Sequence, residues 1–197
     1  SSNSGGGMFC NGCTLTLTNS TVSGNTQGGA SNNGGGGIFT GQGTVTLTNS
    51  TVSGNTSAGS GGGINAGSGT VNVKNTIIAG NTGAVSAPDL SHTGSYTSQG
   101  YNLIGKADGS QGFTNNVNND QVGSNATPLD PKLGPLQNNG GPTFTQALLT
   151  GSPAIDKGAA ATDPTPGSPI TADQRGFTRP LDDPSIPNAS GGNGSDI

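Results

Sequence analysis

The chain contains no glutamate and no tryptophan, and no charged residue precedes Lys74. Its 197 residues carry a formal net charge of only -4. Nucleic-acid binding depends on clustered lysines and arginines that contact phosphates. The scarcity of basic residues therefore excludes a nucleic-acid partner.

Long apolar segments are missing as well. No run of about 20 apolar residues is present, so no segment is expected to span a membrane. No secretory signal peptide is visible, and the first residues already belong to a repeat. We therefore expect the chain to be a fragment of a longer precursor.

Apolar side chains are scarce overall. Leu, Ile, Val and Phe make up roughly a sixth of the chain, below the ~20% at which disorder is expected. That rule also requires a large net charge, which this chain lacks. A solenoid explains the composition better, because each coil buries a few apolar side chains against the next coil.

Three segments of the first half align without gaps. Each follows a glycine run that ends in an apolar residue. Val45 lies 30 residues after Leu15, and Val71 lies 26 residues after Val45. Variable spacing around a constant core places the Gly-, Ser- and Asn-rich insertions in loops. The segments are 15–26, 45–56 and 71–82.

The alternation in 14–18 has the period of a β-strand, with leucines on one side and threonines on the other. Stacking in register predicts an all-β parallel β-helix with three short strands per coil. Residues 1–127 are expected to form the coils, and 128–197 the last coil and an irregular C-terminal cap, in one continuous domain. Proline first appears at Pro88, and it favours irregular backbone. The predicted apolar columns are Leu15, Val45 and Val71 with Leu17, Leu47 and Val73; Val22, Val52 and Ile78; and Met8, Ile38 and Ile64.

Asparagine recurs at two corners of each predicted coil. The side-chain amides are expected to hydrogen-bond from coil to coil and so form ladders along the axis. Ligand binding by a row of amides is the alternative interpretation. Asn19 and Asn49 also begin glycosylation sequons, but an amide that points inward cannot carry a sugar. The two rows are Asn19, Asn49 and Asn75, and Asn25, Asn55 and Asn81.

The second half carries a specific series of motifs: QGYNLIG (99–105), DPKLGPLQNNGGPT (130–143), GSPAID (151–156) and DQRGFTRP (173–180). Their order resembles the choice-of-anchor Q domain proteins, and the resemblance covers nearly the whole chain. It implies a bacterial, extracellular, right-handed parallel β-helix of the pectate-lyase-like superfold, exported to the cell surface. It assigns no catalytic residue to this chain.

Cys10 and Cys13 form a CxxC motif in a turn between two predicted strands. In an exported protein a local disulfide is the expected state. A thioredoxin-like site would need a helix N-terminus beneath the motif, and none is predicted. Zinc would need two further ligands, and the single histidine, His92, is far away in the sequence.

The acidic residues of the tail are the remaining candidate for chemistry. Together with Arg175 and Arg179 they are expected to form a solvated or salt-bridged cap. The alternatives are a weak calcium site and a polysaccharide-lyase-like or carbohydrate-binding site. Since fold alone does not supply activity, no enzyme and no cofactor is predicted. The acidic residues are Asp156, Asp163, Asp173, Asp182 and Asp183.

Outward-facing threonines suggest a second alternative function. A flat, uncharged threonine array is typical of an ice-binding face, although threonine is also a common outward residue of strands. Asn72 and Lys74 interrupt the array in the third coil. The residues are Thr14, Thr16 and Thr18 with Thr44, Thr46 and Thr48.

The N-terminal edge of the first coil lacks a predicted cap. Such an edge exposes unpaired backbone groups and an apolar cross-section, which favours pairing with another coil. Further coils in the full protein, or a second subunit, are expected to cover it. The sequence thus predicts a non-catalytic extracellular structural or adhesive solenoid that self-associates by coil stacking, head to tail, into a surface fibre.

Overall fold

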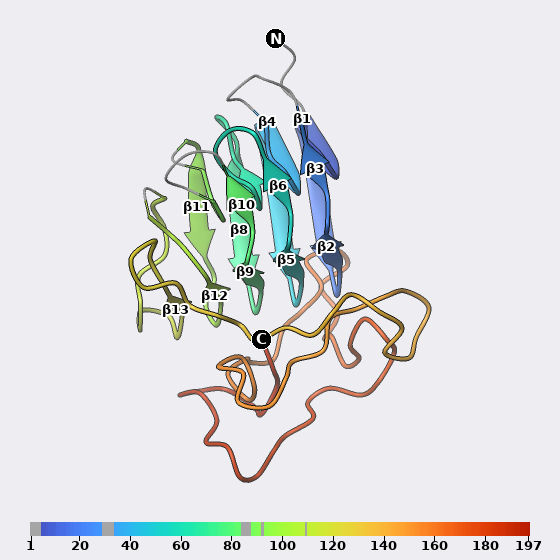
Figure 1. Ribbon diagram of the computed structural model, residues 1–197. Coiled ribbons are helices and arrows are strands. Elements are labelled where there is room, and N and C mark those ends of the chain that lie inside the picture. The colour runs from blue at the N-terminus through green and yellow to red at the C-terminus, as the bar shows by residue number, and fades with distance from the viewer. Residues whose placement is uncertain (1–4, 29–33, 84–87, 92, 109) are drawn as a thin grey trace.

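The computed structural model describes residues 5–28, 34–83, 88–91, 93–108 and 110–197. They form a parallel β-solenoid of about three turns, with an irregular C-terminal segment below it in the view of Figure 1. The described residues contain no helix. The predicted all-β solenoid is confirmed.

Each full coil contributes strands to three parallel sheets, as the repeat predicts. The first sheet has the longest strands: β1 (Met8–Thr18), β4 (Ile38–Thr48), β8 (Thr70–Lys74) and β11 (Ser95–Ser98), with β7 (Ile64–Asn65) also paired to β4. The second sheet runs β2 (Thr21–Ser23), β5 (Thr51–Ser53), β9 (Ile77–Ala79), β12 (Leu103–Ile104) and β13 (Gln121–Val122). The third contains β3 (Thr26–Gln27), β6 (Thr56–Ser57) and β10 (Thr82–Gly83).

The apolar columns lie in the predicted register. Leu17 pairs with Leu47, and Leu47 pairs with Val73. Leu47 and Val73 are completely buried. The other columns match in the same way, and Leu90 extends the third one: Leu15, Val45 and Val71; Val22, Val52 and Ile78; and Met8, Ile38, Ile64 and Leu90.

The glycine runs let the coils approach closely where they enter the first sheet. The backbone N–H of Gly37 donates to Gly62 and Gly63 of the next coil. A Cβ on Gly37 would lie 2.7 Å from the carbonyl oxygen of Gly63 and 3.0 Å from Nδ2 of Asn55. Any side chain here would therefore separate the coils.

The two ends of the solenoid differ. At the N-terminal end, Leu15 and Leu17 are only half-buried, because no described coil covers them. At the other end, Phe113 packs into the core and its ring lies 6.2 Å from that of Tyr96. The segment around Phe113 thus closes the interior of the last coil.

One corner row forms a continuous hydrogen-bonded ladder. Asn25 donates through its backbone N–H (3.0 Å) and its amide (2.9 Å) to Oδ1 of Asn55. Asn55 donates in the same two ways to Oδ1 of Asn81, and Asn81 to Oδ1 of Asp89. Each amide in the series passes hydrogen bonds in one direction, and the series ends on a carboxylate, which only accepts.

Asp89 reaches this ladder from an unexpected position. Its backbone pairs with the glycine run of the third coil, since Ile64 donates to the carbonyl of Asp89. Counting on from the pairing of Ile104 with Ile78, the fourth coil has Ala107 where the ladder would need asparagine. The Asp89 side chain supplies the missing acceptor.

A second ladder lies at the start of the second sheet, one residue after the predicted asparagine row. Backbone N–H groups donate from coil to coil onto Ser50, Thr76, Asn102 and finally Asp120, over 3.0–3.3 Å. The Asn102 amide also donates to Oδ1 of Asp120, at 3.0 Å. This ladder too ends on a buried aspartate.

The row of Asn19, Asn49 and Asn75 is not a continuous ladder. All three have positive φ angles of 46–50°, which suits asparagine at a sharp corner. The Asn75 amide donates to Oδ1 of Asn49 at 2.9 Å, but the Asn19 amide donates instead to the carbonyl of Ala172 at 2.9 Å. The expected coil-to-coil link between Asn19 and Asn49 is thus replaced by contact with the C-terminal segment.

The two ladder-ending aspartates should make stability depend on pH. Burial raises the pKa of both Asp89 and Asp120 above the ordinary 3.8. Their ionisation therefore costs more in the folded chain, so the free energy of unfolding should fall as pH rises from 3.8 through the raised pKa values. Urea unfolding between pH 4 and 7 measures this change, which Asp89→Asn should reduce.

The exposed Asp130→Asn substitution serves as the control and should leave that pH dependence unchanged. A separate loss of stability is expected below pH 3.8. There, hydrogen bonds that hold the pKa of Asp173 below its usual value, against the effect of burial, are lost on protonation. A free energy of unfolding that rises steadily from pH 4 to 7 would contradict the assignment.

Candidate binding cleft between the solenoid and its C-terminal segment

Residues 128–197, called here the tail, fold back along the flank of the solenoid (Figure 1). Asn75 of the third coil donates to the carbonyl of Ala159 at 2.6 Å. Further along the tail, Gln174 accepts a 2.7 Å hydrogen bond from the hydroxyl of Thr21 in the first coil. The tail has an irregular backbone, and it runs along the side of the solenoid, where it contacts the first and the third coil.

A second hydrophobic cluster attaches the tail. Ile77, Ala79 and Leu103 point outward from the second sheet and pack with Ala154 and Ile197 of the tail. Partly buried leucines complete the cluster: Leu129, Leu133 and Leu148.

A signal for this contact is present in the sequence, although the alignment of identical residues does not reveal it. The register aligns Thr21, Thr51, Ile77 and Leu103, so the outward position of the second sheet changes from threonine to aliphatic residues after two coils. An outward aliphatic pair in an otherwise polar surface indicates a covering segment.

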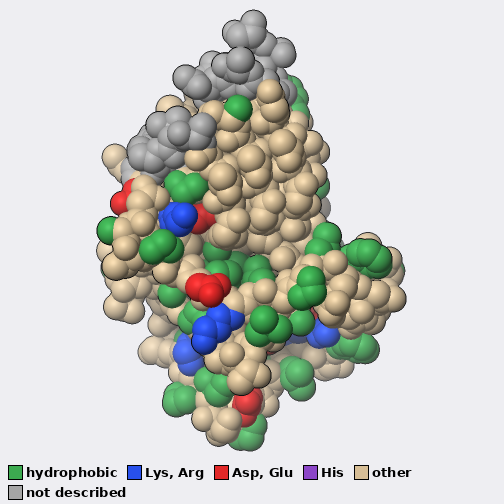
Figure 2. All heavy atoms as spheres, in the orientation of Figure 1, with side chains coloured by type: hydrophobic (Ala, Val, Ile, Leu, Met, Phe, Trp, Pro, Cys, Tyr) green, Lys and Arg blue, Asp and Glu red, His purple; other side chains and the backbone are tan. Residues whose placement is uncertain are grey.

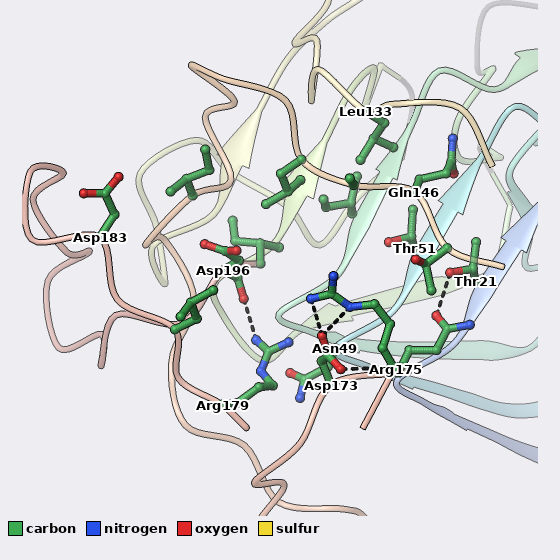
Figure 3. Close-up of a pocket in the computed structure, with 18 of the residues that line it drawn as sticks. Thr21, Asn49, Thr51, Leu133, Gln146, Asp173, Arg175, Arg179, Asp183 and Asp196 are labelled. Carbon is green, nitrogen blue, oxygen red and sulfur yellow. Dashed lines mark hydrogen bonds and ion pairs between the residues drawn. The ribbon is translucent and has the colours of Figure 1, made fainter. Parts of the chain in front are cut away.

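Between the tail and the first coils the contact opens into a cleft of about 360 Å³. The strands supply Thr21, Thr51 and Ile77, and Asn49 borders it from a corner. In Figure 3, Leu133 and Gln146 of the tail lie across the cleft from the charged residues. Gln146 is fixed by a hydrogen bond from the hydroxyl of Ser53.

An ion pair lies on the charged side of the cleft. Nη2 of Arg175 is 2.6 Å from Oδ2 of Asp173, and Nε of Arg175 is 2.8 Å from the same oxygen. Burial would raise the pKa of Asp173, but hydrogen bonds from Arg175 and from the backbone of Phe177 hold it below its usual value. The guanidinium also lies 4.8 Å from the ring centre of Phe177, within cation–π range.

A second pairing involves Arg179 and Asp196 (Figure 3). Nη2 of Arg179 donates to the backbone carbonyl of Asp196 at 2.6 Å. Burial lowers the pKa of Arg179, and the charges of Asp196 and Asp173 oppose that effect. Burial raises the pKa of Asp196. The cleft thus contains one guanidinium in a salt bridge, that of Arg175, and a second, that of Arg179, which is bonded to a backbone carbonyl and lies near the charges of Asp196 and Asp173.

The other acidic residues of the predicted cluster do not form a group; each has its own hydrogen-bond partners or exposure. Asp163 accepts from the backbone of Thr165 within its own turn, and Asp183 does the same with Ser185. Asp156 is completely buried and accepts from the backbone N–H of Asp183, whereas Asp182 is exposed at the cleft. No group of three or more His, Cys or Asp side chains among the described residues is placed to hold a metal ion.

Cys10 and Cys13 form a disulfide with Cα atoms 5.4 Å apart. The predicted turn between two strands is wrong: both cysteines lie within the single strand β1, where its pairing with β4 shifts register around Asn11. Their sequence equivalents in the next coil belong to β4, and Phe9 and Phe39 stack beside them with ring centres 5.4 Å apart. His92 lies outside the described residues.

The outer threonine array is smaller than the sequence predicted. Thr14 pairs with Thr44 and Thr16 with Thr46, and these four residues are at least partly accessible. Thr48 is only 3% exposed, and the hydroxyl of Thr18 is buried without a hydrogen-bond partner. The flat array required for ice binding is therefore reduced to a small patch.

Charge is distributed unevenly over the surface. In the face shown in Figure 2 the coils expose mainly uncharged side chains and backbone, and charged side chains gather toward the tail. No helix in the described parts of the chain is long and apolar enough to cross a bilayer. Searches of family models, curated proteins and solved structures found no match to this chain.

Proposed function

We propose that this chain is a non-catalytic, extracellular structural or adhesive solenoid, similar to the choice-of-anchor Q proteins. One observation carries the proposal: the first two coils present the same uncharged outward side chains in register, as in the pairs Thr14 with Thr44 and Thr16 with Thr46, and the third coil keeps the register with Thr70 and Asn72. A rigid repetitive surface of this kind is suited to contact with extended polymers or neighbouring cells.

The disulfide supports an extracellular location. Disulfides persist in oxidising compartments, and the pair Cys10–Cys13 links two residues of the first coil across a register shift in β1. The hydrogen-bonded ladders give the coils a stability that does not depend on a large apolar core. Both properties suit a protein displayed outside the cell.

Self-association is proposed through the edge of β1. Met8, Leu15 and Leu17 are partly exposed there, whereas their equivalents Ile38 and Val45 are fully buried. Head-to-tail stacking needs two open ends, but Phe113 closes the end opposite β1. The β1 edges of two copies are therefore proposed to pair with each other around a two-fold axis. Sedimentation velocity tests this: a monomer at all concentrations would reject it.

A bead assay tests the adhesive function. Beads coated with the chain are expected to attach to bacterial cells and to insoluble polysaccharide, without release of soluble sugar. Beads coated with reduced, unfolded chain serve as the control. Release of oligosaccharide products would show an enzyme instead, and absence of attachment would reject adhesion.

A further inference from the structure

The cleft combines two kinds of surface. Leu133, Leu148 and Leu181 give part of it an accessible aliphatic lining, and most of the remaining accessible lining is polar. Its volume of about 360 Å³ falls in the range of small-molecule sites, which typically join apolar walls to a few placed polar groups. A ligand with an apolar face and a polar rim would match both surfaces.

The polar groups provide donors and acceptors side by side. Asp173 and Arg175 form one such pair, and nearby Arg179 donates to the backbone carbonyl of Asp196, whose carboxylate accepts from the backbone N–H of Asp156. A hydroxyl both donates and accepts, so neighbouring hydroxyls of one ligand can donate to a carboxylate and accept from a guanidinium. The Asn49 amide accepts from Asn75, and its own NH₂ donates to no described residue, so it remains able to donate into the cleft.

The charge balance restricts the ligand further. Four aspartates and two arginines line the cleft, which gives a formal charge of -2. Arg175 is already paired with Asp173, and Arg179 donates to the Asp196 carbonyl with the Asp196 and Asp173 charges nearby. An anionic ligand would meet a net negative lining, because the two arginines are outnumbered by the four aspartates. Acidic polysaccharides, the usual expectation for a lyase-like solenoid, therefore fit poorly.

We propose that this cleft binds a neutral oligosaccharide, whose ring faces contact the aliphatic lining and whose hydroxyls contact the Asp173–Arg175 pair and Arg179. This inference rests on the proposed adhesive function and places the adhesive contact in the cleft. Thr21 and Thr51 lie on paired strands, so the solenoid wall of the cleft is fixed before the ligand arrives.

A panel of immobilised oligosaccharides tests the proposal, with neutral gluco-, xylo-, manno- and galacto-oligosaccharides compared with oligogalacturonate and oligoalginate. Binding of at least one neutral class is expected, with none of the acidic ones. Titration calorimetry with the best neutral ligand should show about tenfold weaker binding for Arg175→Gln, which loses a charged donor. Thr51→Val preserves the strand and should weaken binding roughly threefold.

Lys74→Gln is the matched control, because it also removes one positive charge but changes a residue of β8 that does not line the cleft. This variant should bind the neutral ligand within about twofold of the original chain. Tighter binding of acidic ligands, no binding of any neutral ligand, or unchanged binding by both cleft variants would overturn the site. Beads coated with Arg175→Gln separate the two proposals. Normal adhesion of the Arg175→Gln beads would reject the cleft as the binding site but leave the adhesive function in place. Release of sugar by the original chain would reject only the proposal that the protein is non-catalytic.

Discussion

Replacing Leu47 with alanine is expected to lower the free energy of unfolding by about 3–5 kcal/mol, the upper part of the range for a buried leucine. Leu47 is completely buried, with Leu17 above it and Val73 below it in the stack. The neighbouring coils are fixed by their own backbone hydrogen bonds, so they cannot collapse into the space. A cavity would remain inside the solenoid.

Leu17→Ala provides the matched comparison, because it removes the same side chain from the same position one coil earlier. Leu17 is only half-buried, so about 1–2 kcal/mol is expected there. Urea unfolding followed by circular dichroism measures both values. Equal losses at the two positions would mean that the N-terminal edge is covered in solution.

Asn55→Ala should cost about 3 kcal/mol, although it removes no apolar contact. The substitution leaves the backbone N–H and the amide of Asn25 without their acceptor, and Oδ1 of Asn81 loses one of its two donors, the Asn55 amide, while the backbone N–H of residue 55 remains. Asn55 is fully buried, and unsatisfied buried groups cost about 1–3 kcal/mol each before water or local shifts compensate.

Asn25→Ala tests the same ladder at its accessible end, where water can replace the lost partner, and about 1 kcal/mol is expected. Asn55→Asp keeps the acceptor oxygen but loses the amide that donates to the carbonyl of Val22. It should be more destabilising at pH 7 than at pH 4.5, since a buried carboxylate is costly when ionised. Similar stability of all three variants would show that the ladder contributes little.

The solenoid was predictable because its information is local and repeated. The alternation around Leu15 and Leu17 specifies a strand, and its recurrence at Val45 and Leu47 specifies the register. The disulfide was predictable from the spacing of Cys10 and Cys13. Each of these features depends on one coil and on the one after it.

The course of the tail was harder to predict, because its contacts join residues far apart in the sequence. Thr21 and Gln174 are separated by 153 residues, and no periodic signal connects them. The same separation brought together Asn19 and Ala172, which removed one expected rung of the amide row. Side-by-side placement of Asp173 and Arg175 followed from the sequence, but their position in a cleft did not.

The second ladder was not predicted, for a different reason. Its members are serine, threonine, asparagine and aspartate, so Ser50, Thr76 and Asn102 share an acceptor oxygen but no residue type. A search for identical residues selects Asn19 and Asn49, one position earlier. Aligning side chains by hydrogen-bonding capacity would have found the series.

The aspartates that end both ladders also determine where this architecture can lengthen. A copied coil inserted before Asp89 would meet amides and hydroxyls on both sides, each able to pass its hydrogen bonds onward. The same copy inserted after Asp120 would bury the Asp120 carboxylate between two coils. A carboxylate only accepts hydrogen bonds, so it could not donate to the inserted coil. Duplication during evolution, or elongation by design, is therefore open only upstream of these two acids.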